Sequence, residues 1–398
     1  MSGRFAFIMS VKRYLQFYYL YLKHIKSISF TLHMPDSEAH KTILLISHDM
    51  ANSGAPILLF HIAKQLKMLG WNIIVVSKLA GPLVHEFSEF AQVYVCRTPA
   101  VFERKVAFLS SCNVSQALLS SAISGDWADF LSSKGFTIVS LVHEMPGAIE
   151  AWGAVSDAKN MATNSSIIVF PSSLVKEKFE WLTGIECESK ILPQGLYLKP
   201  LMRLDRRLAK DFINTEFGLD GKPIILNVAT GNHRKGFDLF VKMASLDSSL
   251  NFVWVGDIDQ DIMETVAKIY SVKSIINLHL VGYIGSLSTL SNFYAAASVL
   301  SLTSREEPFG SIVLEAMYAG TPVIGFEGAG GFQDVVKNGE TGYLVEYENI
   351  QLMLQQIKLL ISSDTIFNKI SNRAKSAVSA YDFPRYVNAL VELFQERK

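Results

Sequence analysis

Cysteine is scarce in this chain: among 398 residues there are three, Cys96, Cys112 and Cys187, and they lie far apart. Their spacing offers neither a disulfide framework nor a metal-binding set, and it fits a protein of a reducing cytosol. Net charge is absent as well, because 37 lysines and arginines balance 37 aspartates and glutamates. The sequence therefore gives no electrostatic basis for binding nucleic acid.

Three motifs of nucleotide or nucleophile chemistry are also missing. The chain contains no G-x-x-x-x-G-K-[ST] phosphate loop. The run Gly328–Gly331 is not the G-x-G-x-x-G fingerprint of NAD enzymes, since Gln333 stands where the third glycine would be. His48 and Asp49 resemble half of a catalytic triad, but no nucleophile elbow accompanies them. These absences argue against a P-loop protein and against an NAD-dependent oxidoreductase.

Apolar material is abundant, with 49% hydrophobic and 19% charged residues, which is ample for large buried cores. From Lys41 onward, short apolar runs alternate with helix-length segments such as Gly54–Leu69, which Gly70 is expected to end. This βαβ repetition predicts parallel sheets covered on both faces. The expected strands are Thr42–Ser47, Asn72–Ser77, Val93–Cys96, Thr137–Val142, Ile167–Pro171, Ile224–Ala229, Phe252–Gly256, Ile276–Gly282, Ser298–Ser304 and Thr321–Phe326.

The alternation loosens near residue 200, where Leu198–Phe212 is polar and basic. We therefore expect two doubly wound α/β domains of similar size, which meet near this segment. The carboxyl ends of parallel strands open into a cleft between two such domains, and that cleft is the expected ligand site.

Residues 1–40 interleave basic and aromatic side chains. Five basic residues, from Arg4 to Lys26, precede the first acidic residue, and the aromatic run Phe17–Leu22 lies between them. This apolar run is too short to span a bilayer, and no convincing small-residue cleavage site follows it. The segment either contacts an anionic membrane surface or forms a capping helix or a mobile tail.

The stretch Ser304–Phe326 places two carboxylates, Glu307 and Glu315, around a Pro-Phe-Gly sequence and an apolar run. We expect a helix over Gly310–Ala319, which puts Glu307 on the preceding loop and Glu315 inside the helix. The helix start at Gly310 and Ser311 offers backbone N–H groups that attract an anion.

An ionised carboxylate only accepts hydrogen bonds, so it suits the adjacent hydroxyls of a ribose or a sugar. The stretch thus combines N–H groups for phosphates with one acid for each sugar of a sugar nucleotide. The alternative is that Glu315 lies on a solvated helix face.

This stretch resembles the E-x7-E signature of retaining glycosyltransferases of family 4, and Gly328–Val345 resembles the continuation of that signature. The resemblance covers residues 41–395 in layout and is specific over 303–345. It implies the GT-B fold, with two Rossmann-like domains that face a central cleft. The implied parts are an acceptor domain (41–198), a donor domain (199–380) and a terminal helix (381–398) that crosses back to the first domain.

The resemblance also implies which residues bind the donor. Glu307 would hold the donor sugar as a catalytic residue, and Glu315 would hold the ribose. Phe309, Gly310 and Ser311 complete this part of the donor site.

A basic phosphate-binding segment is implied after the first strand of the second domain, and Asn227–Phe240 lies there. Lys235 with the following glycine matches the Lys-Gly pair of the family, and its charge would stabilise the leaving diphosphate as a catalytic residue. Asn232 stands where the family often has an arginine. Arg234 either replaces that arginine or points to solvent. Without the resemblance, the segment is an ordinary basic loop.

In the first domain, the resemblance places the donor phosphate or the acceptor near Gly54, where glycine permits a close backbone approach. By itself, the sequence around Gly54 is only a helix start. His143 corresponds to a histidine beside the reacting sugar, where it would donate to a donor-sugar hydroxyl or orient the acceptor. Glu144 either orients His143 or binds the acceptor. A lone histidine is more often structural.

The resemblance implies a retaining glycosyltransferase of the hexosyltransferase type, which moves a sugar from a nucleoside-diphosphate sugar to an acceptor hydroxyl. No metal or other cofactor is expected, and Asp257-x-Asp259 is expected to be an ordinary loop. The expected acceptor is a lipid-linked or growing surface glycan, and the expected location is cytoplasmic, peripheral on the inner face of the plasma membrane through residues 1–40. Two alternatives stay open: a GT-B sugar-nucleotide epimerase, and a non-catalytic sugar-nucleotide-binding partner of a glycan-assembly complex.

Overall fold

The computed structural model describes residues 41–396 except 101, 104–108, 110–113 and 198–203. The predicted membrane-contacting segment (1–40) and the predicted domain boundary (198–199) lie outside the described residues. The chain divides into two compact units. The described residues up to Ile168, together with Glu180–Ser189 and the residues from Glu392, form unit 1. Unit 2 contains Val169–Phe179 and the described residues of Lys190–Val391.

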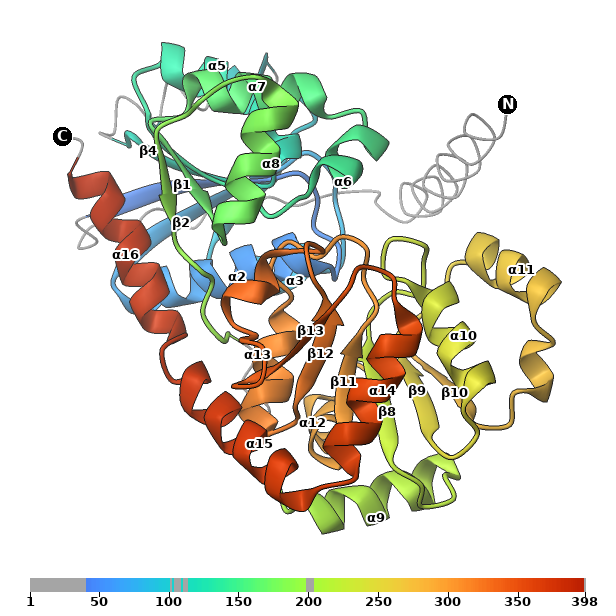
Figure 1. The fold of residues 1–398 in the computed structure, drawn as a ribbon. Coiled ribbons are helices and arrows are strands. Elements are labelled where there is room, and N and C mark those ends of the chain that lie inside the picture. Colours follow the sequence, from blue (N-terminus) through green and yellow to red (C-terminus); the bar gives the residue numbers. More distant parts are fainter. Residues whose placement is uncertain (1–40, 101, 104–108, 110–113, 198–203, 397–398) are drawn as a thin grey trace. The chain divides into compact units, whose positions relative to one another are not determined.

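Within the described residues, the first sheet has seven strands in the order β3-β2-β1-β4-β5-β6-β7, and its first five strands pair in parallel. The strands are β1 (Lys41–Ser47), β2 (Trp71–Ser77), β3 (Gln92–Val95), β4 (Gln116–Ser120), β5 (Thr137–Leu141), β6 (Ile167–Phe170) and β7 (Ser189–Ile191). The accompanying helices are α2 (Gly54–Met68), α3 (Leu83–Ser88), η1 (Ala122–Trp127), α5 (Ala128–Ser133), α6 (Pro146–Ala151), α7 (Val155–Asn164) and α8 (Ser173–Thr183). Figure 1 shows this alternation of strands and helices.

The second sheet, in the part of the chain that the structure describes, has six parallel strands in the order β10-β9-β8-β11-β12-β13. They are β8 (Ile224–Val228), β9 (Asn251–Val255), β10 (Leu278–Gly282), β11 (Val299–Leu302), β12 (Val323–Phe326) and β13 (Gly342–Val345). The accompanying helices are α9 (Arg206–Phe217), α10 (Phe237–Leu246), α11 (Gln260–Ile269), η2 (Val272–Ser274), α12 (Leu287–Ala296), α13 (Ser311–Ala319), η3 (Gly331–Asp334), α14 (Ile350–Ile361), α15 (Asp364–Val378) and α16 (Phe383–Gln395).

All ten predicted strands coincide with observed strands, and the helix predicted over Gly54–Leu69 is observed as α2. Strands β4, β7 and β13 were not predicted from the sequence. Strand β4 reads Gln-Ala-Leu-Leu-Ser and contains no β-branched or aromatic residue, so it lacks the usual strand signal. Strand β7 is a short segment at the end of the sheet.

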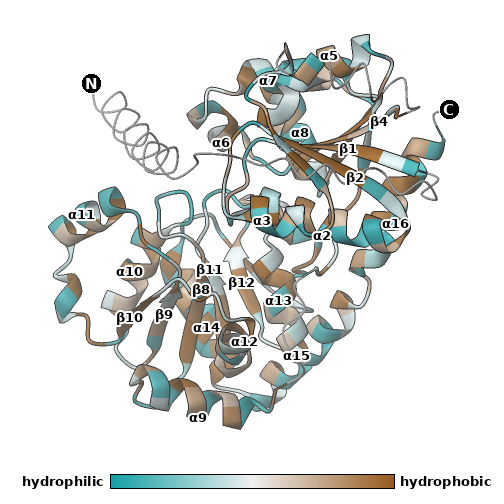
Figure 2. Ribbon diagram, turned by 180° about the vertical axis from the view of Figure 1, so that it is seen from behind, coloured by the Kyte–Doolittle hydropathy of each residue, from teal (hydrophilic) through white to brown (hydrophobic). Residues whose placement is uncertain are grey.

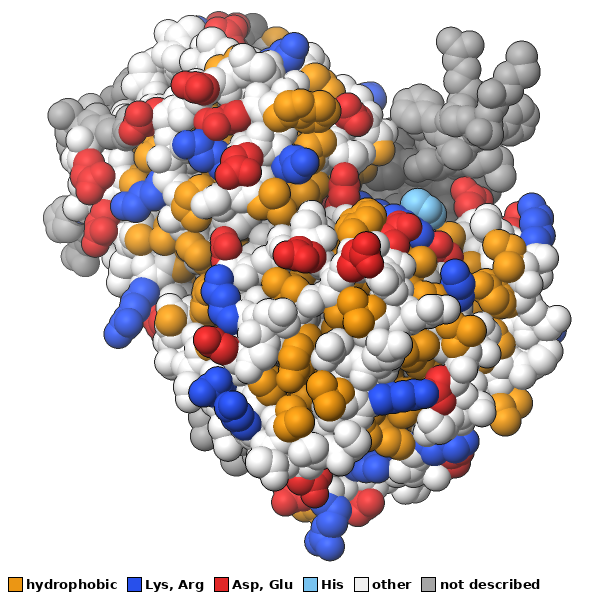
Figure 3. All heavy atoms as spheres, viewed as in Figure 1, with side chains coloured by type: hydrophobic (Ala, Val, Ile, Leu, Met, Phe, Trp, Pro, Cys, Tyr) orange, Lys and Arg blue, Asp and Glu red, His pale blue; other side chains and the backbone are white. Residues whose placement is uncertain are grey.

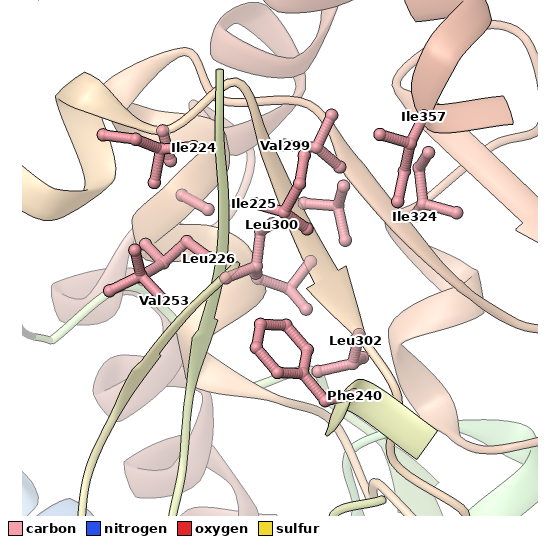
Figure 4. Close-up of a cluster of buried hydrophobic side chains, with 14 of the residues drawn as sticks. Ile224, Ile225, Leu226, Phe240, Val253, Val299, Leu300, Leu302, Ile324 and Ile357 are labelled. Atoms are coloured by element: carbon pink, nitrogen blue, oxygen red, sulfur yellow. The ribbon is translucent and has the colours of Figure 1, made fainter. Parts of the chain in front are cut away.

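The strands are mostly hydrophobic, as their colour in Figure 2 shows. The inner strands of both sheets are buried under the covering helices, whereas the edge strands β3, β7 and β10 are only partly buried. In unit 2, buried side chains of β8, β9 and β11 gather with Phe240 of α10 (Figure 4). In contrast to this apolar core, the surface carries many charges: on the face shown in Figure 3, basic and acidic side chains are interspersed. Among the helices of the described residues, none combines the length and the apolar character needed to cross a membrane.

The strand order reverses direction at β8 and β11 in unit 2. The chain runs from β8 to β9 and β10 on one side, and then from β11 to β12 and β13 on the other. Ligands of open α/β sheets bind at the carboxyl ends of the strands where this reversal occurs. Strands β1 and β4 form the corresponding reversal in the first sheet. A ligand site is therefore expected at the loops that follow these four strands.

Candidate functional site

Lys235 and Glu307 meet at the strand reversal of unit 2. Lys235 lies on the loop between β8 and α10, and Glu307 lies on the loop between β11 and α13. The Lys235 Nζ contacts the Glu307 Oε2, so the two side chains form an ion pair. The pair is largely withdrawn from solvent, with 16% of the Lys235 side chain and 7% of the Glu307 side chain exposed. The structure thus brings together two predicted site residues that are 72 positions apart.

The two loops are fastened to each other along their backbones. The Arg305 N–H donates to the Arg234 carbonyl at 2.8 Å, and the Thr303 hydroxyl donates to the Lys235 carbonyl at 3.1 Å. Gly236 has a φ of +68°, and a Cβ there would overlap the Thr303 carbonyl oxygen. Only glycine therefore allows this approach of the loops, which places the Lys235 side chain beside Glu307.

The Gly328–Gly331 run fixes the other side of the Glu307 loop. The Glu307 N–H donates to the Ala329 carbonyl at 2.8 Å, and the Gly331 N–H donates to the Glu307 carbonyl at 3.1 Å. A Cβ on Gly330 would overlap the Glu307 carbonyl oxygen. A Cβ on Gly331 would likewise overlap the Pro308 carbonyl oxygen, so Gly330 and Gly331 serve the close packing of two backbones.

The charges at this site favour an ionised Glu307. Burial opposes ionisation of this carboxyl, but the charges of Lys235 and Arg234 and the hydrogen bonds from Lys235 and Ser304 bring its pKa below the ordinary value. Burial lowers the pKa of Lys235, against the opposite effect of Glu307. The two cations and one carboxylate leave one positive charge in excess among these three groups, which suits an anion.

Arg234 is half-buried, and its guanidinium Nη1 donates to the Glu306 carbonyl at 2.9 Å. The side chain is therefore attached to the Glu307 loop instead of extending freely into solvent. Arg305, which was not among the predicted site residues, forms a two-bond ion pair with Asp238 at 2.8 Å. This second pair also joins the loop after β11 to helix α10.

Helix α13 begins directly after the Glu307 loop. Gly310 precedes it with a φ of +76°, and the helix start leaves backbone N–H groups without intrahelical partners. The Ser311 hydroxyl accepts from the Gln194 Nε2 at 2.6 Å and lies 3.1 Å from the Tyr197 hydroxyl. The Phe309 side chain is buried and packs against Tyr381, so a ligand could meet only its backbone.

Glu315 lies inside α13 and is buried, with 5% of the residue exposed. The alternative that it lies on a solvated face is therefore wrong. The Tyr294 hydroxyl of helix α12 donates to the Glu315 Oε2 at 2.6 Å. Burial raises the pKa of Glu315 to about 7, and the hydrogen bond from Tyr294 opposes this rise.

The predicted residues of unit 1 lie at the carboxyl ends of its strands. Gly54 is the first residue of α2, which follows β1, and it is exposed. A Cβ at this position would meet no atom within 4 Å. Packing within the described residues therefore does not require glycine here.

His143 and Glu144 follow β5. Both ring nitrogens of His143 are buried and have no hydrogen-bond partner among the described residues. Burial lowers the pKa of His143, against the opposite effect of Glu144, so the neutral imidazole is favoured. The Glu144 Oε2 accepts from the backbone N–H groups of His143 at 3.0 Å and Ala122 at 3.1 Å. Glu144 thus holds two loop backbones in place, a role that the sequence reading missed.

Asp257 and Asp259 lie on the loop between β9 and α11. The Gly231 N–H donates to the Asp257 carbonyl at 2.7 Å, and the Asp259 N–H donates to the Gly231 carbonyl at 2.9 Å. Their backbones therefore shape the loop that leads to Lys235. Among the described residues, no three His, Cys, Asp or Glu side chains gather as a metal site.

Tyr294 is the site residue with the weakest sequence signal. It lies 21 positions before Glu315 on a different helix, and nothing in the local sequence of α12 marks it. Only the packing of α12 against α13 brings the two side chains together. Asn227 was also missed: its side-chain amide donates to the Ser301 carbonyl at 2.8 Å and to the Thr303 hydroxyl at 3.1 Å.

Solved structures of glycosyltransferases share this fold. The chain superposes on the crystal structure of HepE from Anabaena in complex with UDP and glucose with a TM-score of 0.76 and 17% sequence identity. The superposition covers 90% of this chain and 100% of HepE. The predicted GT-B class with two Rossmann-like parallel α/β units is therefore confirmed, while the predicted cleft stays a prediction.

One sequence comparison falls within unit 2. Residues 210–377 match the family model described as Glycosyl transferases group 1, and this segment contains Lys235, Glu307 and Glu315. An uncharacterized glycosyltransferase of Haemophilus influenzae is 25% identical over 169 residues, which are 41% of this chain and 46% of that relative. The poly(glycerol-phosphate) alpha-glucosyltransferase of Bacillus subtilis is 29% identical over 171 residues, 41% of this chain and 24% of that relative. The chain spans less than half the length of these curated relatives.

Glu315 should give the stability of the chain a pH dependence. Its pKa in the folded chain is about 7, against an ordinary value of 4.5, so the folded state retains a proton that the unfolded state releases. The resulting stabilisation is complete below the ordinary pKa and is lost as the pH rises through about 7. Because Glu315→Gln cannot ionise, we expect it to gain about 2.5 kcal/mol of stability relative to wild type between about pH 5 and about pH 8.

Denaturant unfolding at the two pH values measures this difference. Glu216→Gln, at an exposed position of α9, is the control and should follow wild type. Parallel pH profiles of Glu315→Gln and wild type would contradict the prediction.

Proposed function

We propose that this chain is a retaining glycosyltransferase of family 4, which transfers a sugar from a nucleoside-diphosphate sugar to an acceptor hydroxyl. The observation that carries the proposal is the buried Lys235–Glu307 pair at the strand reversal, directly before the start of α13. Glu307 and Glu315 have the E-x7-E spacing. The match of residues 210–377 to group 1 glycosyltransferases supports the same activity.

In this proposal, Lys235 and the α13 N–H groups stabilise the diphosphate as it leaves. Negative charge grows on the departing phosphate oxygen in the transition state, so a cation there strengthens its interaction as the bond breaks. The ion pair with Glu307 holds Lys235 in place before the donor arrives, which reduces the cost of reorganisation. Glu307 then accepts hydrogen bonds from hydroxyls of the donor sugar, and Glu315 accepts from the ribose.

The retaining step proceeds by front-side attack, in which the acceptor oxygen bonds to the anomeric carbon on the face that the diphosphate leaves. The departing phosphate oxygen takes the proton of the acceptor hydroxyl. No side chain is assigned as a covalent nucleophile. The chain's groups supply orientation, charge stabilisation and water exclusion, and no metal is assigned a role.

Unit 1 supplies Gly54 and His143. Gly54 gives the donor phosphate or the acceptor a close approach to the start of α2, where the helix dipole is positive. The neutral imidazole of His143 can both donate and accept, so its two unpartnered nitrogens suit sugar hydroxyls.

The proposed acceptor is a lipid-linked or growing surface glycan, handled by a cytoplasmic protein at the inner face of the plasma membrane. The printed name of the Bacillus subtilis relative refers to a poly(glycerol-phosphate). HepE, which shares the fold, was crystallised with UDP and glucose. The basic and aromatic composition of residues 1–40 suits an anionic leaflet.

The donor should be identified by ligand-induced stabilisation, since a bound ligand raises the melting temperature by mass action. We expect one of a panel of UDP, GDP and ADP sugars to stabilise the purified chain, and the same donor to yield a glycosylated acceptor. An altered free sugar nucleotide would instead identify an epimerase. Binding without turnover would identify a silent binding partner. The absence of any stabilisation would contradict the whole proposal.

Lys235→Ala should lower turnover more than donor affinity. A cation that acts mainly on the leaving group contributes about 100-fold or more to kcat, whereas we expect the donor Kd to change by about tenfold or less. Steady-state kinetics and calorimetric titration separate the two effects. Lys242→Ala, on the exposed face of α10, is the control. Wild-type turnover in Lys235→Ala would remove its proposed role.

Gly54→Ala should separate function from stability. Because an added Cβ meets no atom of the protein, we expect the free energy of unfolding to change by less than about 0.5 kcal/mol. The methyl group would occupy the space proposed for substrate, so kcat/KM should fall by about tenfold or more. Ser53→Ala, at the preceding exposed position, should leave both quantities unchanged. An active Gly54→Ala variant would contradict the close approach at Gly54.

A further inference from the structure

The buried hydrogen bond between Tyr294 and Glu315 is not explained by folding alone. Tyr294 is 1% exposed, and its hydroxyl bonds a carboxylate that is itself 5% exposed. Removing a carboxylate from water is costly, and an apolar pair of similar volume between two helices is often at least as stable. The pair therefore points to a role in which the carboxylate has to be held in one orientation.

The groups around Glu315 differ from those around Glu307. Tyr294 approaches from α12. Burial raises the pKa of Tyr197 to about 12, and the nearby charge of Glu315 adds to this rise. The Tyr197 hydroxyl lies beside Ser311, at 3.1 Å from the Ser311 Oγ, and not on the Glu315 carboxylate. Among the described residues, no lysine, arginine or histidine forms an ion pair with Glu315. The hydrogen bond from Tyr294 is thus the one interaction that orients this carboxylate within the described part of the chain.

We propose that Tyr294 is a positioning residue of the donor site, which fixes the Glu315 Oε2 so that the Oε1 accepts from the ribose hydroxyls of the nucleotide. This inference rests on the proposed function, because Glu315 is assigned to the ribose there. A glutamate on a helix has several side-chain rotamers, and a hydrogen bond at 2.6 Å selects among them before the ligand binds. Tyr294 itself does not touch the ligand.

The pH dependence of ribose recognition follows from this arrangement. Burial raises the pKa of Glu315 to about 7, while the bond from Tyr294 favours the ionised form. The ionised carboxylate accepts from two hydroxyls, so discrimination in favour of ribose should grow as the pH rises through about 7. Loss of the Tyr294 hydroxyl should move that midpoint to higher pH.

The test compares the affinities of UDP, GDP and ADP with those of their 2′,3′-dideoxy forms across this pH range, by calorimetry on the full chain. The ratio of the two affinities cancels the ionisation of the phosphates, which both forms share. In wild type, we expect the ratio for the bound nucleotide to rise with a midpoint near pH 7. In Tyr294→Phe, the ratio at neutral pH should fall about tenfold, since a hydrogen bond to a charged group is lost, and the midpoint should rise.

Two further variants complete the design. Tyr386→Phe removes another buried tyrosine hydroxyl, one without a hydrogen-bond partner among the described residues, and should keep the wild-type profile. Replacing Tyr294 by 3-fluorotyrosine keeps the shape and strengthens the donor, so its midpoint should move to lower pH. This second substitution gives a result even where Tyr294→Phe folds poorly.

The outcomes distinguish this inference from the proposed function. A wild-type midpoint in both Tyr294 variants would overturn the positioning role. Equal affinity of wild type for the ribose and dideoxy forms would overturn it too, but would leave the transferase proposal standing on Lys235. Failure of wild type to bind any of the three diphosphates would overturn both.

Discussion

The ion pair between Lys235 and Glu307 is the interaction on which the rest of the site depends. It joins two loops that are far apart in sequence, and it can form only because β8 and β11 are neighbours in the sheet. Breaking a buried pair leaves an uncompensated charge and is far costlier than breaking an exposed one. The pair of Arg305 with Asp238 acts in parallel, because it joins the loop after β11 to helix α10. The pairing of β8 with β11 thus brings the two loops close together, and the ion pairs hold them there.

Much of the fold could be predicted because its strands are short, continuous apolar runs, which is the pattern of strands that are buried on both faces. Strand β4 was missed because Gln-Ala-Leu-Leu-Ser has no strand-specific residue types. Its place between β1 and β5 is set by packing over long sequence distances, which a local pattern does not contain. The same limitation explains why sequence spacing identified the expected strands but not the complete order of the sheet.

The candidate site could be predicted where a motif places a side chain relative to a helix start, as for Glu307, Gly310 and Glu315. The sequence could not reveal Tyr294, because its partner lies on another helix. The backbone role of Glu144 was equally hidden, since an acidic side chain after a strand is compatible with many partners. The sequence thus identifies candidate site residues, while the tertiary contacts determine which of their side chains interact.

The pKa values of the two carboxylates of this motif, Glu307 and Glu315, are shifted in opposite directions. Glu307 has Lys235 and Arg234 beside it, and its pKa lies below the ordinary value. Glu315 accepts from the Tyr294 hydroxyl and has no cation partner among the described residues, and burial raises its pKa to about 7. A carboxylate that is already paired with a cation stays ionised when a ligand hydroxyl binds, because the cation stabilises its charge more than a neutral hydroxyl does. In a buried carboxylate without a cation, each added hydrogen-bond donor lowers the pKa more, because few other groups stabilise the ionised form. The folded chain is therefore less stable above neutral pH, where Glu315 is ionised. The same ionised carboxylate is an acceptor that a ligand hydroxyl can stabilise.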